Sequence, residues 1–307
     1  MHKILFGVTL VALNIIFIQI PYAAETLSKP LVLHGTKDKV ITGLRIENPD
    51  GVCIQLVNCE NIRIEKCVLG PAKGEGVAIS DSKNVTVVEN RMEHVRSGVY
   101  AHRAQGICVE KNYFKNIQGP FPRGQFVQFD KVSGGRNRVN DNFGENVQGQ
   151  SNPEDAINMY KSSGTESDPI QIMRNKIRGG GPSGSGGGIM TGDDGGGYII
   201  VKDNILVDPG QYGIAIASGT HIQILDNQVY AHQQPFTNVG IYVWNQYAPE
   251  CAHHVVRGNK VNWTNRDGVK NPAWNAGNCG TVEGWDQNEW NAAINASILP
   301  SEKSTTD

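Results

Sequence analysis

Apolar and polar positions alternate in short runs along most of the chain, and the runs recur in a nearly constant pattern. Seven segments place two apolar residues, one or two polar residues, an asparagine and further apolar residues in similar order: VTVVENRM, ICVEKNYF, NRVNDNFG, IQIMRNKI, IIVKDNIL, IQILDNQV and HVVRGNKV. Their asparagines are Asn90, Asn112, Asn142, Asn175, Asn204, Asn227 and Asn259, with Cys67 in the equivalent place one turn earlier. Successive positions lie 22 to 33 residues apart. A repeat near 22 residues with occasional insertions is typical of a solenoid.

Each repeat also contains a short strand-like run that opens with a glycine or another turn residue. These runs are GVAIS, GVYAH, QFVQF, DAINM, GGIMT, GIAIA and GIYVW. Their alternation and β-branched residues predict strands rather than helices. Stacked parallel strands with inward Val and Ile and an interior asparagine ladder predict an all-β fold, a right-handed parallel β-helix. The tail WDQNEWNAAINAS has helical spacing, so we expect a short C-terminal helical or loop cap.

The first residues, MHKILFGVTLVALNIIFIQIPYAA, have the charged start, apolar middle and small-residue end of a secretory signal peptide. We therefore expect a signal peptide at 1–24, a β-helix catalytic domain at 25–280, and a cap and tail at 281–307. The net charge of −2 gives no general attraction to nucleic acid or anionic membranes. After cleavage of the signal peptide, the mature protein is expected to be a secreted monomer, extracellular or periplasmic, with no membrane contact.

Six cysteines in an exported chain favour disulfides. Cys251 and Cys279 bracket a Trp- and Asn-rich loop and are the favoured pair. Cys53, Cys59 and Cys67 fall in the first turns, where a second bridge is an open alternative. Cys108 is interpreted as a buried free thiol, and none of the six has the spacing of a metal site.

Aligning GVYAHR, FVQFDK and AINMYK as neighbouring turns predicts which side chains share a face. Equivalent residues on adjacent turns lie about 4.8 Å apart. The inward positions are then Val99, Val127 and Ile157, followed by Ala101, Phe129 and Met159. The outward positions are Tyr100, Gln128 and Asn158, followed by His102, Asp130 and Tyr160, with a column of cations made by Arg103, Lys131 and Lys161. Like charges in register destabilise a sheet, so this column favours a bound anion.

Other features extend the same face. Tyr242 and Trp244 point outward, where a sugar ring can stack. The insertions GPFPRGQ, GQSNPEDA, GGGPSGSGG and HQQPFTN are expected to wall a groove, because long loops on one side of a rigid scaffold usually carry binding. An acidic polysaccharide is the predicted partner.

With these repeats and strands, the chain resembles the right-handed β-helix polysaccharide enzymes of the pectate-lyase-like superfamily, and most of all the small single-domain alginate lyases. The resemblance covers almost all of the chain after the leader and implies β-elimination from a uronate polymer, with alginate favoured. Lyases of this fold that act on alginate and dermatan use a Lys base, an Arg about one turn later and a calcium ion nearby. This chain has Lys131 followed by Lys161 instead, and then Asp193 and Asp194.

For that reaction the catalytic candidates are Lys161, Lys131, Tyr160, Arg103 and His102. Crowding among cations lowers the pKa of a lysine, so Lys161 or Lys131 is the expected base, with Arg103 holding the substrate carboxylate. Tyr160 is the expected proton donor, or the base itself, and His102 is a secondary acid or base. The substrate-binding candidates are Asp130, Arg178, Asn158, Gln128, Tyr100, Tyr242 and Trp244.

No cofactor is required by these residues. Asp193 and Asp194, with Asp130, form an alternative calcium site, because carboxylate oxygens are the ligands that calcium prefers.

Three rival functions stay open at this stage. An inverting glycoside hydrolase would use Asp193 and Asp194 with Asp155 or Asp130 as a third carboxyl, although no Gly-His-Gly or Arg-x-Lys motif of the β-helix polygalacturonases follows in the expected place. A C5-epimerase of this fold carries Asp-Pro-His, which the sequence lacks. A non-catalytic carbohydrate-binding β-helix is the third alternative.

Overall fold

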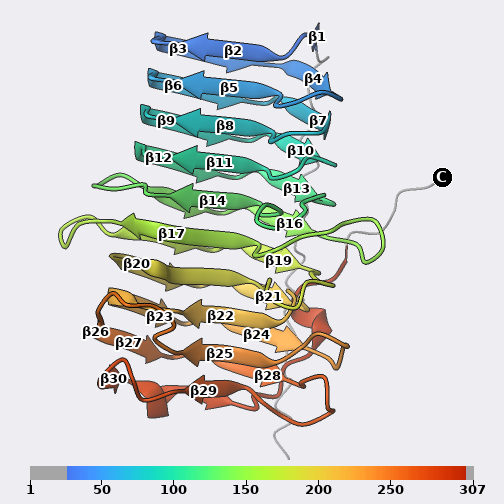
Figure 1. The fold of residues 1–307 in the computed structure, drawn as a ribbon. Helices are drawn as coiled ribbons and strands as arrows, with labels where there is room; N and C mark the ends of the chain where they lie inside the picture. The colour runs from blue at the N-terminus through green and yellow to red at the C-terminus, as the bar shows by residue number, and fades with distance from the viewer. Residues whose placement is uncertain (1–25, 302–307) are drawn as a thin grey trace, which may run out of the picture.

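A computed structural model describes residues 26–301, and the expected signal peptide lies outside the described residues. The chain winds into a right-handed parallel β-helix in which every turn lays a strand on each of three faces (Figure 1). Register follows the sequence alignment: Val99 pairs with Val127 and Val127 with Ile157, and all three side chains are buried. The predicted fold class is therefore confirmed.

The first face is a sheet of eleven strands. They are β1 (Thr26–Ser28), β4 (Leu44–Asn48), β7 (Val68–Ala72), β10 (Arg91–Glu93), β13 (Tyr113–Lys115), β16 (Phe143–Glu145), β19 (Lys176–Arg178), β21 (Ile205–Val207), β24 (Gln228–Ala231), β28 (Lys260–Trp263) and β31 (Glu289–Trp290).

The second face is the one on which the sequence places the candidate site. Its strands are β2 (Leu31–His34), β5 (Ile54–Val57), β8 (Val77–Ser80), β11 (Val99–His102), β14 (Val127–Asp130), β17 (Ile157–Ser163), β20 (Ile189–Lys202), β22 (Tyr212–Ile216), β25 (Val239–Val243) and β29 (Ala273–Asn275). The long β20 bends into the third face, where it pairs with β18 and β23, and so joins the two faces into one sheet.

The third face contains β3 (Lys37–Thr42), β6 (Glu60–Glu65), β9 (Lys83–Val88), β12 (Gln105–Glu110), β15 (Arg138–Asn140), β18 (Ile170–Met173), β23 (Gly219–Leu225), β26 (Cys251–Ala252), β27 (His254–Arg257) and β30 (Val282–Glu283). The repeat VTVVENRM thus forms two strands, β9 and β10, with its asparagine at the corner between them.

The corner asparagines form a continuous buried ladder through the molecule. At a typical rung, Asn175 donates from both its backbone N and its Nδ2 to Oδ1 of Asn204, at 2.8 and 2.9 Å. Its own Oδ1 accepts the same two bonds from Asn142. The ladder begins where Cys67 N donates to Asn90 and ends at Asn288, one rung further than the sequence pattern indicated.

The C-terminal segment takes the loop form of the expected helical or loop cap. Within the described residues it contains two short 3₁₀ turns, η1 (Trp285–Gln287) and η2 (Ala296–Ile298), and no α-helix. Strands β30 and β31 continue the solenoid past residue 280, because Asn288 supplies another rung of the ladder. Trp285 and Trp290 pack against the end of the core, so they, rather than a helix, cap the apolar interior.

The cysteine assignments hold in part. Cys251 and Cys279 form a disulfide, the pair favoured by the sequence. The second bridge among the first turns is not formed, since Cys53 and Cys59 are buried free thiols that contact the carbonyl oxygens of Ile46 and Leu33. Cys108 is free but only half-buried, because it lies on the outward side of β12.

Replacing one rung of the ladder should destabilise the whole solenoid. Asn175→Ala leaves the backbone N of Asn142 and the carbonyl oxygen of Val139 without their buried partners. We expect the free energy of unfolding to fall by about 2–3 kcal/mol, which denaturant titration measures. The control is Asn84→Gly, which removes a side-chain bond to Asn61 in a more exposed ladder at a backbone φ of 51° that glycine accepts, and it should cost less than about 1 kcal/mol. Equal losses in the two variants would contradict a special role for the buried ladder.

Candidate functional site

A pocket of about 570 Å³ lies on the second face, over β14, β17, β20, β22, β25 and β29. All four insertions singled out in the sequence contribute to it, through Arg123, Glu154, Ser185 and Asn238 among others. Seven of the predicted site residues line it: Gln128, Asp130, Asn158, Tyr160, Asp193, Tyr242 and Trp244. Residues of adjacent turns meet there as expected, with Gln128 beside Asn158 and Asp130 beside Tyr160.

Two of the three cations in the predicted column are paired with aspartates. Arg103 makes a two-pronged ion pair with Asp81, at 2.7 and 2.8 Å, and Lys161 Nζ lies 2.8 Å from Oδ2 of Asp194. Neither residue lines the pocket, and Lys131 does not either. All three have positive φ, between 47° and 57°, because the chain turns the corner immediately after the outward-facing strand positions. Their side chains therefore belong to the corner and not to the pocket.

Lys161 lacks the lowered pKa that was expected of a base. Its hydrogen bond to Asp194 raises the pKa of the ammonium above its usual value. Crowding by cations was expected to lower that pKa, but an adjacent carboxylate stabilises the charged form. Lys161 therefore holds its proton in the folded protein.

Arg178, Asp193 and Asp194 make contacts that differ from those expected from the sequence. Arg178 lies on β19, in the first sheet, and donates from Nη1 to the carbonyl oxygen of Leu299 at 2.7 Å. Asp193 accepts from Tyr247 and Asn158, while Asp194 accepts from Lys161 and Tyr160. Protein donors already engage both carboxylates, and within residues 26–301 no third carboxylate converges with them, so the alternative calcium site gains no support here.

A cluster around Arg123 closes one end of the pocket. The hydroxyl of Tyr100 donates to Oδ2 of Asp130 at 2.7 Å, and Nδ1 of His102 lies 3.1 Å from the same oxygen. The Arg123 guanidinium stacks over the Tyr100 ring, 4.0 Å from its centroid, and Nη1 donates to Gln128. His102 and Tyr100 therefore support Asp130 from outside the lining, while Arg123, which the sequence analysis missed, lies in the wall.

Asp155 is a nearly buried carboxyl that lines the pocket. It is only 6% exposed and accepts hydrogen bonds from the Tyr212 hydroxyl, from Nδ2 of Asn158 at 2.7 Å and from the backbone N of Gly187 at 3.1 Å. Burial raises its pKa from 3.8 to about 7, against the lowering effect of its hydrogen bonds. Sequence analysis considered Asp155 only as a distant third carboxyl, since its position depends on the insertion that precedes β17.

Asn158 links Asp155 to Asp193. Its Nδ2 donates to Oδ2 of Asp155 at 2.7 Å and to Oδ2 of Asp193 at 2.9 Å. Asp193 is less buried than Asp155 and also accepts from the hydroxyl of Tyr247 at 2.7 Å. Two carboxyl groups therefore flank one amide in the pocket, in environments that differ in burial. Such a difference separates the protonation states of paired carboxyls and is typical of acid–base pairs.

Aromatic side chains form the opposite wall. Trp244 and Trp274 lie on adjacent turns with ring centroids 5.4 Å apart, and each is more than a third exposed. Tyr242, which was expected to be exposed, is 8% exposed because Tyr212 packs edge-on against it. The wall thus offers two open indole faces and one nearly covered phenol ring.

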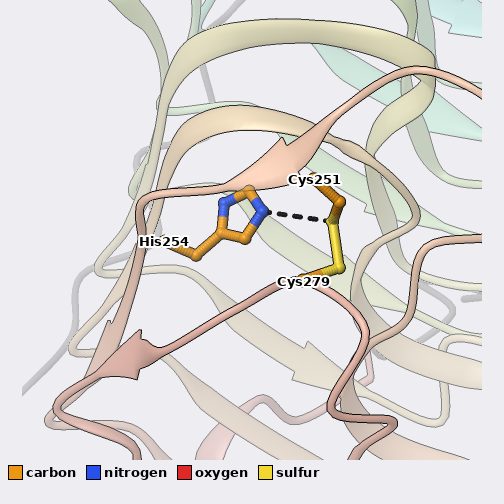
Figure 2. A group of neighbouring side chains, drawn as sticks. All are labelled: Cys251, His254 and Cys279. Atoms are coloured by element: carbon orange, nitrogen blue, oxygen red, sulfur yellow. Dashed lines mark hydrogen bonds between the residues drawn. A yellow bond between two sulfur atoms is a disulfide. The ribbon is translucent and has the colours of Figure 1, made fainter.

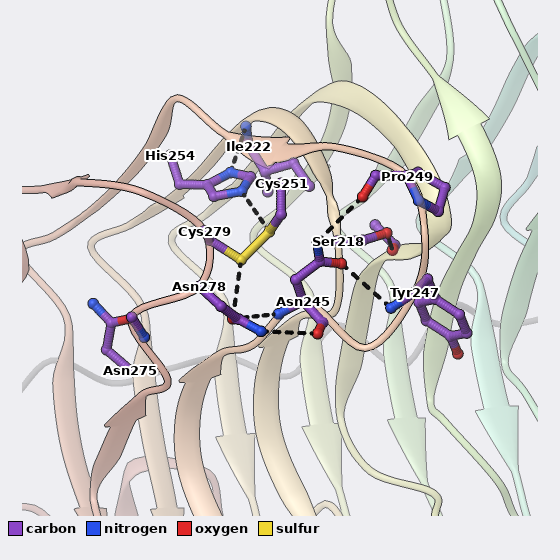
Figure 3. Close-up of a disulfide and its surroundings, with 12 residues drawn as sticks. Ser218, Ile222, Asn245, Tyr247, Pro249, Cys251, His254, Asn275, Asn278 and Cys279 are labelled. Carbon is purple, nitrogen blue, oxygen red and sulfur yellow. Dashed lines mark hydrogen bonds between the residues drawn. A yellow bond between two sulfur atoms is a disulfide. The ribbon is translucent and has the colours of Figure 1, made fainter.

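The disulfide holds this aromatic wall together (Figure 3). Cys251 ends the loop that carries Trp244 and Tyr247, and Cys279 follows the strand that carries Trp274. Beside the bridge, Asn278 accepts from the backbone N of Asn245 and donates to its carbonyl oxygen, at 2.9 and 3.0 Å. Both segments of the wall are therefore fixed to one another by a covalent bond and two hydrogen bonds.

His254 completes a buried cluster with the two half-cystines (Figure 2). Its Nε2 lies 3.3 Å from Sγ of Cys251, and its Nδ1 accepts a long hydrogen bond from the backbone N of Ile222. Within residues 26–301 this is the one group of three His, Cys, Asp or Glu side chains whose donor atoms lie within 4.8 Å of one another. Burial lowers the pKa of His254 to about 4.

Comparison with known families decides what this chain is. A family model named NosD, periplasmic copper-binding protein, matches residues 37–268. The chain belongs to the NosD family. No curated protein sequence matches the chain.

Several solved structures resemble this NosD-family chain at low identity. An alginate lyase, AlyF-OU02 in complex with G6, is 13% identical with a TM-score of 0.44 over 79% of this chain and 55% of that one. A periplasmic alginate epimerase, AlgG, is 11% identical with a TM-score of 0.48 over 82% and 69%. A tailspike protein of E. coli bacteriophage HK620, in complex with a hexasaccharide, is 12% identical with a TM-score of 0.43 over 83% and 57%. The NosD-family chain thus spans about half the length of the lyase, and likeness at this identity concerns the fold alone.

The raised pKa of Asp155 predicts a pH dependence of stability. The folded protein keeps a proton that the unfolded chain releases, so the free energy of unfolding falls as the pH rises from about 4 to about 7. Asp155→Asn removes the titrating carboxyl. The Tm of this variant should therefore rise relative to that of the wild type as the pH increases from about 4 to about 7. The control, Asp267→Asn, changes an exposed carboxyl away from the pocket. Parallel Tm curves for wild type and Asp155→Asn would contradict the assignment.

Loss of the disulfide should loosen the aromatic wall. Cys251 and Cys279 are 28 residues apart, and removing a bridge across a loop of that length lowers the free energy of unfolding by about 3–4 kcal/mol, because the unfolded chain gains freedom. The double variant Cys251→Ser with Cys279→Ser should therefore show faster hydrogen exchange in residues 244–251 and 273–279, measured by mass spectrometry. Cys108→Ser is the matched control and should leave the exchange rates of both segments unchanged. Unchanged exchange rates in the double variant would contradict a structural role for the bridge in this wall.

Proposed function

We propose that this NosD-family protein hydrolyses a glycosidic bond of a glycan held in the pocket. The single observation that carries the proposal is the pair of carboxyls joined through Asn158: Asp155, whose pKa is raised to about 7 by burial, and the more exposed Asp193. Asp155 keeps its proton up to about pH 7 and serves there as the general acid toward the leaving oxygen. Asp193 acts as the second carboxylate, against water or the anomeric carbon.

The remaining lining suits a sugar chain. The open faces of Trp244 and Trp274 offer stacking surfaces for pyranose rings, and Gln128, Asn158 and Gln246 supply amide groups for hydroxyls. Such a lining combines apolar faces with a few directed polar groups, which is typical of ligand pockets. The scaffold supports this use, since parallel strands hold successive side chains in a row along an extended substrate.

β-Elimination from a uronate, with alginate first among the polymers, is the second candidate. One observation favours it: the hydroxyl of Tyr160 and the guanidinium of Arg123 line the same pocket, as a proton donor and a carboxylate partner would. Its lysine base has lost support, because Lys161 is paired with Asp194.

The family description also names copper and the periplasm. A periplasmic location agrees with the disulfide, and residues 26–301 include no helix with the length and apolar character that a bilayer crossing requires. The described donor trio does not fit copper as it stands: Cys251 and Cys279 are bonded to each other, so their sulfurs are not thiolates, and His254 faces Cys251. The proposed reaction therefore has no step through a metal.

Product analysis on a panel of neutral, basic and uronate polysaccharides tests the proposal. Hydrolysis gives new reducing ends without unsaturated sugars, whereas elimination gives ultraviolet absorbance from unsaturated ends. We expect reducing ends only, with activity falling above about pH 7 as Asp155 loses its proton. Absorbance from unsaturated ends would overturn hydrolysis in favour of the second candidate.

Variants assign the residues in the same assay. Asp155→Asn and Asp193→Asn should each lower turnover by about 100-fold or more, since each removes a proton-transfer or charge-stabilising group. Lys131→Ala should leave turnover within about twofold of wild type, because Lys131 lies outside the pocket. The proposed pair of Asp155 and Asp193 would be contradicted if Lys131→Ala lost its activity while Asp193→Asn kept wild-type turnover.

A further inference from the structure

The charge of the pocket is the reverse of what an acidic glycan requires. Its lining contains one cation, Arg123, and four acidic side chains, Asp130, Glu154, Asp155 and Asp193. Arg123 is already engaged, over the ring of Tyr100 and with Nε 3.7 Å from Glu75. Within residues 26–301, no Lys or Arg side chain forms an ion pair with Glu154, Asp155 or Asp193. Asp155 holds its proton up to about pH 7, but the other three acidic side chains still outnumber the one cation, so the pocket presents an excess of negative charge.

The protein donors that reach these carboxyls are neutral. Asp193 accepts from a phenol and an amide, Asp155 from a phenol, an amide and a backbone N, and Glu154 from the hydroxyl of Ser185. Neutral donors satisfy the geometry of a carboxylate but leave its charge in place. A ligand that carries positive charge gains from that field, and a uronate is repelled by it.

A buried acceptor without a donor points to where the ligand binds. Asn158 is 4% exposed, lines the pocket, and its Oδ1 has no hydrogen-bond partner in the described structure. Amide orientation is not interchangeable here, because Nδ2 must face the two aspartates that accept from it. Oδ1 of Asp130, further along the lining, also lacks a partner. Buried acceptors in native proteins are normally satisfied, so each of these oxygens indicates a donor from the ligand.

Aromatic rings add to the attraction for a cation. Trp244, Tyr247 and Trp274 surround the acidic side chains, and each is more than a third exposed. Ring faces attract ammonium groups through their quadrupoles, and they stack on sugar rings as well. The carboxylates, the unpaired amide oxygen and the aromatic faces together can bind an ammonium group carried on a pyranose ring.

We infer that the pocket selects an amino sugar with a free ammonium group, as in a glucosamine polymer, bound with its nitrogen near Oδ1 of Asn158 and the carboxylate of Asp193. An ammonium has three donors, which suits the orphan oxygen and the carboxylate together. An N-acetylated sugar retains one neutral N–H there, and a uronate supplies no cation. This inference rests on the proposed function, since it names the substrate class for the same pocket.

Binding calorimetry with three hexamers of equal length tests the selection: glucosamine, N-acetylglucosamine and galacturonate. We expect the glucosamine hexamer to bind at least about tenfold more tightly than the acetylated one, with the advantage shrinking at high salt as charges are screened. Galacturonate should bind most weakly. Equal affinities, or preference for either of the other hexamers, would overturn the inference.

Variants locate the ammonium. Asp193→Asn should weaken glucosamine-hexamer binding by about tenfold and change N-acetylglucosamine binding by less than about threefold, because only the charged ligand loses an ion pair. Asp267→Asn, the exposed control, should change neither. Loss of the same factor for both ligands in a folded Asp193→Asn protein would show that Asp193 does not select for charge.

Product analysis of the same samples separates the two proposals. Glucosamine-selective binding without new reducing ends would remove hydrolysis and leave the selection standing. Hydrolysis of a neutral polymer with no preference for the free amine would do the opposite.

Discussion

The asparagine ladder is the interaction on which the rest of the molecule depends. At the corner between the third and the first face, each turn exposes backbone groups that neither neighbouring strand can pair, and a buried amide side chain satisfies them while bonding to its equivalent on the next turn. Because the bonds run from turn to turn, they fix the stacking distance and the register together. The row of outward side chains over β14, β17 and β20 is aligned as a consequence, which is the condition for any site that several turns share.

Much of this architecture was readable from the sequence because it repeats. Alternation located the strands, the asparagine spacing located the corners, and the pairing of Val99, Val127 and Ile157 followed from the alignment alone. Asn288 was missed because its segment also fits a helical spacing, and only the stacking of a further turn distinguishes the two.

Only part of the candidate site could be predicted from the sequence, and the reason is physical. Residues on the strands, such as Gln128, Asn158 and Tyr160, line the pocket as the register predicts. Arg103 and Lys161 continue the same columns in sequence, but the chain turns there with positive φ and their side chains pair with aspartates at the corner. Asp155 and Arg123 come from insertions whose paths no repeat specifies. Register irregularities between β17 and β20 pair Tyr160 with Asp193, and a regular alignment of the repeats does not predict this pairing.

The bridge between Cys251 and Cys279 also gives the molecule an order of completion. The loop with Trp244 and Tyr247 and the strand with Trp274 belong to successive late turns, and the covalent link between them forms only after the last of these turns has been laid down and the thiols have met an oxidant. A chain still in a reducing compartment would have a folded solenoid but an unfastened aromatic wall. The aromatic wall is thereby completed only where the two thiols can be oxidised.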